Sequence, residues 1–315
     1  MKFGIKTGQG QAAYTYEDLS SIWSKSDELG FDSAWLHDHF LAVSFTERPS
    51  DPCLEAYATL TALARDTRRL RLGVMVTCVS YRNPAYLAKV GATIDSISKG
   101  RFMMGIGAGW NEAEYRAYGY DFPTLPDRLG QLRETLEILR LMWTETSPSF
   151  AGKHFTIANA TCNPKPVQSS PPVWVGISKG TETLPRLAVK HADGLNTTAD
   201  PTLCTQIIQR AEETRAKLKR ARSEVTYSAQ PVVLVGTTSE VERIVEQEAR
   251  RLSMSPKDYL ERLKGRRCII GTPEQCAEGL RAYADSGVEY LVPLIIGDRL
   301  IWPLETVRDK LLPLL

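Results

Sequence analysis

Short apolar runs alternate with longer amphipathic segments along almost the whole chain. Brief runs of β-branched or apolar residues are typical of buried strands, whereas apolar residues that recur every third or fourth position indicate helices. The pattern predicts eight strands, at residues 2–6, 33–37, 69–77, 101–106, 172–176, 193–197, 225–235 and 290–296.

Helical periodicity fills the segments between these strands. Gly30 suits a left-handed C-cap after the first helix, and a hairpin is expected at 150–157. Near the end of the chain, Thr272 can cap a helix whose first residue is Pro273, with Glu274 in its first turn. The predicted helices are 16–29, 54–65, 84–97, 128–143, 181–191, 201–220, 240–252, 256–264, 272–286 and 305–312.

Strands that alternate with helices, without a break in composition, predict an α/β fold: a single (β/α)₈ TIM barrel with small insertions. A doubly wound open sheet is the alternative, but it usually has fewer strands in a chain of this length. In a barrel of this kind, the site lies where the strands run into the following loops.

The chain has 315 residues, of which 43% are apolar and 24% charged, as in globular proteins with a substantial core. A net charge of +2 gives no indication of a nucleic-acid partner. We expect neither a signal peptide nor a membrane span, since no sufficiently long apolar run occurs. The six cysteines lack CxxC spacing and indicate reduced thiols, so a cytoplasmic protein is predicted. A small-molecule substrate is also predicted.

Unusual polar residues follow the second predicted strand. In His37-Asp38-His39 the two histidines point to one side of the chain and Asp38 to the other. A metal site would need further ligands, and only His154 and His191 remain in the sequence, so no metal is predicted. An acid–base or cofactor-contacting histidine is favoured, with a purely structural histidine as the alternative.

Two glycine-containing junctions suggest contact with a flat, phosphorylated ligand. Gly107 and Gly109 permit a close backbone approach, although Trp110 stands where the dinucleotide fingerprint requires glycine. In the segment 176–181 two glycines flank Ser178-Lys179 just before a predicted helix, which suits a phosphate cradle. A capped loop with an exposed lysine is the alternative.

The motifs Tyr81-Arg82-Asn83-Pro84, Ser98-Lys99-Gly100-Arg101-Phe102 and Gly107-Ala108-Gly109-Trp110-Asn111-Glu112-Ala113-Glu114 resemble the bacterial luciferase-like superfamily, and most nearly its F420-dependent oxidoreductase branch. The likeness continues in order through 164–168, 172–176, 192–196 and 271–274. It implies one luciferase-like barrel domain over residues 1–315, a homodimer, and a non-proline cis peptide within Val74-Met75-Val76.

The resemblance also implies roles for individual residues. Asp38 and His39 match a catalytic pair that contacts the ring or the substrate. The positions expected to line the cofactor ring are Val74, Met75, Thr77, Gly107, Ala108 and Gly109. The positions expected to bind its phosphate are Gly176, Ile177, Ser178, Lys179, Gly180 and Thr181.

The function that the resemblance implies is hydride transfer between C5 of the deazaflavin coenzyme F420 and an unidentified organic substrate. A reduced-FMN-dependent monooxygenase, with FMN as cofactor, is the first alternative, and a non-catalytic flavin-binding barrel is the second. In the sugar-phosphate dehydrogenases of this family a glutamate lies near the substrate, after the fourth strand. Trp110 stands there in this chain, which argues against that substrate and predicts a more apolar pocket wall.

Overall fold

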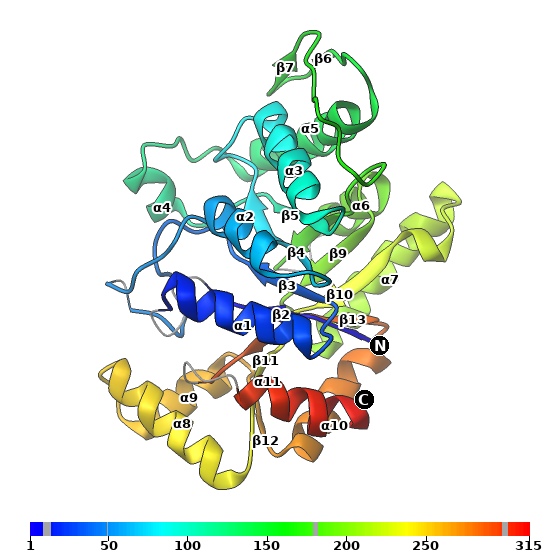
Figure 1. Ribbon diagram of the computed structural model, residues 1–315. Helices are drawn as coiled ribbons and strands as arrows, with labels where there is room; N and C mark the ends of the chain where they lie inside the picture. The colour runs from blue at the N-terminus through cyan, green and yellow to red at the C-terminus, as the bar shows by residue number, and fades with distance from the viewer. Residues whose placement is uncertain (9–13, 49, 179–181, 298–301) are drawn as a thin grey trace.

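A curled sheet of parallel strands forms the centre of the molecule (Figure 1). The computed structural model describes residues 1–8, 14–48, 50–178, 182–297 and 302–315. The strands of this sheet are β1 (Lys2–Phe3), β2 (Ile5–Lys6), β3 (Ser33–Leu36), β4 (Arg71–Cys78), β5 (Phe102–Gly107), β8 (Val173–Ile177), β9 (Gly194–Thr197), β10 (Thr226–Ala229), β11 (Val232–Val235), β12 (Ile269–Gly271), β13 (Tyr290–Leu291) and β14 (Leu294–Ile295).

The pairing of the strands brings the two ends of the chain together. β3, β4, β5, β8 and β9 are neighbours in this order, and each described pair in the sheet is parallel. β1 pairs with β13 through Lys2 and Tyr290, and β2 pairs with β14 through Lys6 and Leu294. The sheet is therefore curled, with its first and last strands side by side.

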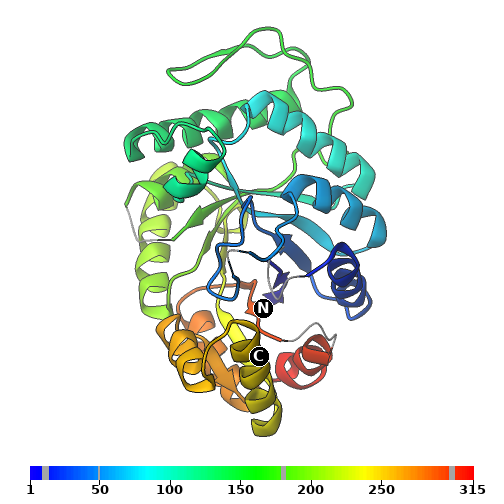
Figure 2. The same ribbon diagram turned by 90° about the vertical axis from the view of Figure 1, so that its left-hand side faces the viewer.

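Helices surround the strands, as Figure 2 shows. β6 (Phe150–Ala151) and β7 (Thr156–Ile157) form a separate antiparallel hairpin, which confirms the expected one. The helices are α1 (Tyr16–Glu28), α2 (Ala56–Asp66), α3 (Pro84–Ser98), α4 (Glu112–Ala117), α5 (Leu125–Thr144), α6 (Thr183–His191), α7 (Pro201–Leu218), α8 (Thr238–Arg251), α9 (Pro256–Gly265), α10 (Pro273–Asp285) and α11 (Trp302–Thr306), followed by short π-helical and 3₁₀ turns to Leu314.

Three predicted strands, at 2–6, 225–235 and 290–296, are each divided in two in the structure. Proline lacks the amide donor that a continuous ladder needs, and Pro231 and Pro293 lie in two of the breaks.

The predicted caps are confirmed: Gly30 has a φ of 77°, and the side chain of Thr272 accepts a hydrogen bond from the amide of Gln275. The short elements α4 and β12 were not predicted.

Side chains fill the inside of the curled sheet. The rings of Trp35 and Trp174 stack with centroids 5.3 Å apart, and Tyr290 meets Trp174 edge-on at 5.1 Å. Met75 and Met103 belong to the same buried cluster. The interior is therefore a packed core, so that a ligand site must lie at an end of the strands. No described helix is long and apolar enough to cross a membrane.

Candidate functional site

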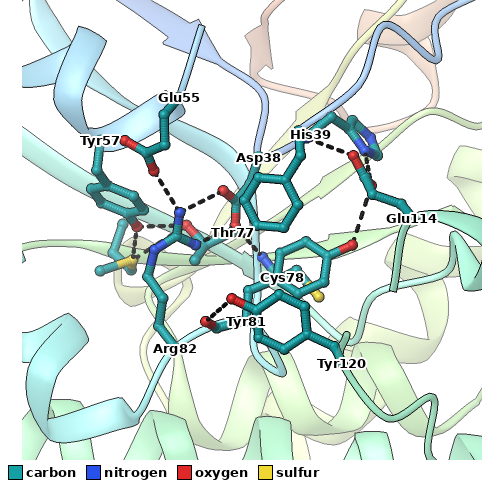
Figure 3. Close-up of polar contacts among 12 residues, drawn as sticks. Asp38, His39, Glu55, Tyr57, Thr77, Cys78, Tyr81, Arg82, Glu114 and Tyr120 are labelled. Atoms are coloured by element: carbon teal, nitrogen blue, oxygen red, sulfur yellow. Dashed lines mark hydrogen bonds and ion pairs between the residues drawn. The ribbon is translucent and has the colours of Figure 1, made fainter. Parts of the chain in front are cut away.

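Polar side chains converge at the carboxyl ends of β3, β4 and β5 (Figure 3). Asp38 and His39 come from the loop after β3, Tyr81 and Arg82 from the loop after β4, and Glu114 from α4, which follows β5. Asp38 and Glu114 are almost completely buried. The rings of His37 and His39 lie 5.1 Å apart, which confirms that they point to the same side.

Asp38 ties two of these loops together. Its Oδ2 accepts hydrogen bonds from the amide of Cys78 (2.9 Å) and Nη1 of Arg82 (2.7 Å), and its Oδ1 accepts from Nη2 of Arg82 (2.9 Å). Arg82 also donates to Glu55 at 2.7 Å and lies over the ring of Tyr57. Both oxygens of Asp38 are therefore engaged by the protein itself.

Glu114 holds the ring of His39. Nδ1 of His39 lies 2.7 Å from Oε2 of Glu114, which also accepts a hydrogen bond from the Tyr81 hydroxyl at 3.1 Å. Oε1 of Glu114 accepts from the amides of Phe40 (2.5 Å) and Leu41 (3.1 Å). Four donors thus surround one buried carboxylate.

The electrostatics of this pair define which nitrogen of His39 is available. Burial opposes the ionisation of Glu114, but its bond to His39 and the amides of Phe40 and Leu41 outweigh burial and hold its pKa below the ordinary value. An ionised carboxylate can only accept, so Nδ1 of His39 carries a hydrogen. Nε2 of a neutral His39 then has a lone pair that no described residue engages, on a side chain that is 18% exposed.

His37 differs from His39 in its surroundings. Burial, followed by the charges of His39 and Lys6, holds the pKa of His37 well below its ordinary value. His37 is therefore neutral at physiological pH, and His39 is the better candidate for proton transfer.

β4 contains the expected irregular peptide. The bond between Met75 and Val76 is cis, which confirms the prediction for this segment. Val74 and Met75 are buried, and the hydroxyl of Thr77 lies 2.6 Å from that of Tyr57. Hydrogen bonding therefore already occupies the side chain of Thr77.

Two of the predicted glycines pack against Val76. A Cβ atom at Gly107 would lie 2.7 Å from one methyl of Val76, and a Cβ at Gly176 would lie 2.7 Å from the other. Gly109 has a φ of 76°, and its Cβ would clash with the hydroxyl of Tyr115. At Gly107, Gly109 and Gly176, only glycine fits without displacing a neighbour. Ala108, between Gly107 and Gly109 in the sequence, is half-buried.

The predicted phosphate segment is described only in part. Ile177 is buried and Ser178 is exposed, while Lys179, Gly180 and Thr181 lie outside the described residues. The following helix, α6, begins at Thr183, and no side chain among the described residues caps its start.

Trp110 borders His39. Its side chain is 65% exposed, and its ring meets that of His39 edge-on, with centroids 5.8 Å apart.

Among the described residues no cluster of histidine, cysteine or acidic side chains is arranged to hold a metal ion. Sequence reasoning assigned no role to Glu114 or Arg82, although both lie within the quoted motifs and are the closest polar partners of His39 and Asp38.

Comparison of the sequence with known proteins identifies the family of this chain. Residues 1–257 match the model of the luciferase-like monooxygenase family. An F420-dependent glucose-6-phosphate dehydrogenase from Amycolatopsis mediterranei (strain U-32) is 26% identical over 313 residues, spanning 93% of this chain and 92% of the relative.

Solved structures share the fold. An F420-dependent secondary alcohol dehydrogenase in complex with an F420–acetone adduct superposes with a TM-score of 0.84 at 19% identity, covering 100% of this chain and 99% of that one. The monooxygenase RslO1 from Streptomyces bottropensis gives 0.82 at 19% identity, with 99% of each chain covered. With most of its length matched by the family model, the chain belongs to the luciferase-like monooxygenase family.

Proposed function

We propose that this protein is an F420-dependent oxidoreductase that transfers a hydride between C5 of the deazaflavin and an organic substrate. The His39–Glu114 pair carries the proposal, because it supplies a base with a defined free nitrogen at the sheet end where this fold binds ligands. The relative from Amycolatopsis mediterranei, which has F420 dependence in its name, supports the choice of cofactor.

We also infer that the curled sheet is a complete (β/α)₈ barrel and that residues 1–315 form one domain. The pairing of β1 with β13 and of β2 with β14 supports this inference, since it joins the first strand to the last. The homodimer and the cytoplasmic location expected from the sequence stay predictions.

The residues around Val76 fit a flat cofactor. Gly107 and Gly176 let the backbone approach Val76 more closely than a residue with a side chain could, since a Cβ at either position would lie 2.7 Å from a Val76 methyl group. These glycines and the backbone of 74–77 would hold the ring, and Ser178 with the first turn of α6 would meet its phosphate. When bound, the deazaflavin supplies a carbon that accepts or gives up a hydride.

The protein would supply proton transfer and positioning. Nε2 of His39 takes the proton from a substrate hydroxyl as the hydride leaves the neighbouring carbon, or returns it in the reverse direction. Glu114, bonded to Nδ1, stabilises the imidazolium that forms. Asp38 contributes indirectly, because its ion pair with Arg82 fixes the loop that carries His39. Trp110 would form an apolar wall beside the reacting group.

A fluorescence titration of the purified protein with F420 and with FMN tests the proposal. We expect saturable F420 binding that is tighter than FMN binding. Preferential binding of FMN, with oxygen uptake when the flavin is reduced, would instead favour the monooxygenase, and binding of neither cofactor would refute both.

A substitution at Gly176 should weaken F420 binding. The new Cβ of Gly176→Ala meets Val76 at 2.7 Å, and overpacking of this kind typically costs about 1–3 kcal/mol. We expect the Kd for F420 to rise about tenfold, as measured by the same titration. Gly265→Ala is the matched control, since nothing lies within 4 Å of its added methyl group. An unchanged Kd in Gly176→Ala would place the ring elsewhere.

A further inference from the structure

Lys6 is a cationic residue on the inner face of the curled sheet, at the carboxyl end of β2. Ile5, the residue before it, belongs to the core that includes Trp23 of α1, and successive side chains of a strand point to opposite faces. Lys6 is in register with Trp35 of β3, whose ring lies in the cluster inside the sheet. Lys6 therefore faces inward, at the end of the sheet that carries His39.

Gln230, between β10 and β11, holds the side chain of Lys6. Nζ of Lys6 donates to Oε1 of Gln230 at 3.1 Å, and the backbone amide of Gln230 donates to the carbonyl of Thr197 at 2.8 Å. An ammonium group can only donate, so the side-chain amide turns its oxygen toward Lys6 and its NH₂ group away. The other hydrogens of Nζ and those of Gln230 Nε2 have no partner among the described residues.

The charge of Lys6 has no counter-ion in the part of the chain that the structure describes. No acidic side chain there lies within ion-pair distance of its Nζ. Two arginines that contact the loop after β3 differ in this respect, since Arg82 pairs with Asp38 and Arg251 with Asp51. A cation withdrawn from water is costly unless it is paired. Lys6 is half-buried, so a ligand that enters from the end of the sheet reaches it.

The electrostatics agree with this geometry. Burial lowers the pKa of Lys6 to about 8, while the charge of Glu47, in the loop after β3, acts in the opposite direction. Lys6 in turn contributes, after burial and the charge of His39, to the low pKa of His37. At neutral pH Lys6 is therefore mainly protonated, and an anion bound beside it would raise its pKa.

We propose that Lys6 and Gln230 bind a carboxylate group of the substrate, which makes the substrate a hydroxy acid and the product the corresponding oxo acid. This assignment rests on the proposed oxidoreductase function. One ammonium and one amide group offer a single positive charge and two donors, which suits a singly charged carboxylate better than a phosphate dianion. In the oxidative direction the C–H bond of the alcohol carbon breaks, and its hydride passes to the cofactor, which is the oxidant. The hydroxyl proton joins Nε2 of His39, a C=O bond forms, and the carboxylate is unchanged.

The order of the strands sets the orientation of such a substrate. β2, β3, β4 and β5 are neighbours in the sheet. Lys6 at the end of β2 and Trp110 after β5 therefore lie on either side of the loop that carries His39. A hydroxy acid would place its hydroxyl group at His39, its carboxylate toward Lys6 and its apolar part toward Trp110.

The test measures carboxylate binding by the protein without F420. Protein labelled with ¹³C at the lysine ε-carbons is titrated by NMR, and the Lys6 signal is identified by its absence in Lys6→Met. We expect 3-hydroxybutyrate to bind saturably and to raise the pKa of Lys6 by about 1, as a nearby opposite charge does. The uncharged methyl ester of 3-hydroxybutyrate should leave this pKa unchanged, and inorganic phosphate should bind more weakly than 3-hydroxybutyrate.

Variants of the two residues separate charge from shape. Lys6→Met should weaken 3-hydroxybutyrate binding about tenfold or more, the typical loss for a hydrogen bond to a charged group, whereas Lys6→Arg should keep most of the affinity. Gln230→Glu retains the shape of the side chain and supplies the missing acid. In this variant the pKa of Lys6 should rise without any added anion, and 3-hydroxybutyrate should bind about tenfold more weakly. Lys2→Met is the matched control, since Lys2 is exposed on β1, and it should bind as the wild type does.

Three results would overturn the carboxylate site: a Lys6 pKa that 3-hydroxybutyrate does not change, equal affinities in wild type and Gln230→Glu, or tighter binding of phosphate than of 3-hydroxybutyrate. The F420 titration is a separate measurement. Failure to bind F420 refutes the oxidoreductase, whereas an unresponsive Lys6 refutes only the carboxylate site.

Discussion

His39→Gln should lower the rate of hydride transfer by about 10²–10⁴-fold, the range that loss of a general acid–base group typically produces. Glutamine retains the volume and a hydrogen-bonding end but cannot take up the substrate proton. F420 affinity should be unchanged, because His39 is assigned to proton transfer and not to the cofactor. The measurement is the change in deazaflavin absorbance in single turnovers, with secondary alcohols and glucose 6-phosphate as the first substrates.

Two further variants define the source of that loss. Glu114→Gln should also slow turnover, because a neutral amide stabilises the imidazolium less than the carboxylate at 2.7 Å does. His154→Gln should have no effect. Wild-type turnover in His39→Gln would mean that this histidine is structural, the alternative left open by the sequence.

The order of strands and helices was predictable because it depends on local periodicity. Every predicted helix has a counterpart. The errors concern ends, interruptions such as the breaks at Pro231 and Pro293, and the short elements α4 and β12, which were missed. The position of His39 was also predictable, because the end of a strand in this fold faces the ligand. These conclusions needed no knowledge of contacts between distant segments.

The partners of His39 were not predictable in the same way. Glu114 lies on a helix of six residues, which is too short to show a helical period. Asp51, in the loop after β3, is buried and pairs with Arg251, which lies 200 residues away in the sequence. An acidic residue in a polar loop normally indicates solvent exposure, and only tertiary packing reverses that expectation.

Arg82→Met should lower the free energy of unfolding by about 3–5 kcal/mol, the cost of breaking a buried ion pair by removing one partner. The Arg82 side chain is 12% exposed and that of Asp38 only 1%, so solvent screens this pair weakly. Without Arg82, the Cys78 amide is the one donor that the described residues still offer to the buried charge of Asp38. Chemical denaturation followed by circular dichroism measures the change.

An exposed pair provides the matched control. Arg116 and Glu112 are separated by 2.6 Å but are 75% and 49% exposed, so Arg116→Met should cost only about 0.5 kcal/mol or less. Adding Asp38→Leu to Arg82→Met should recover part of the stability, because the unpaired charge is then removed. Equal losses in the two single variants would show that burial does not strengthen the Arg82–Asp38 pair. The fixed position of His39 would then have to come from Glu114 and the three other donors that hold its carboxylate.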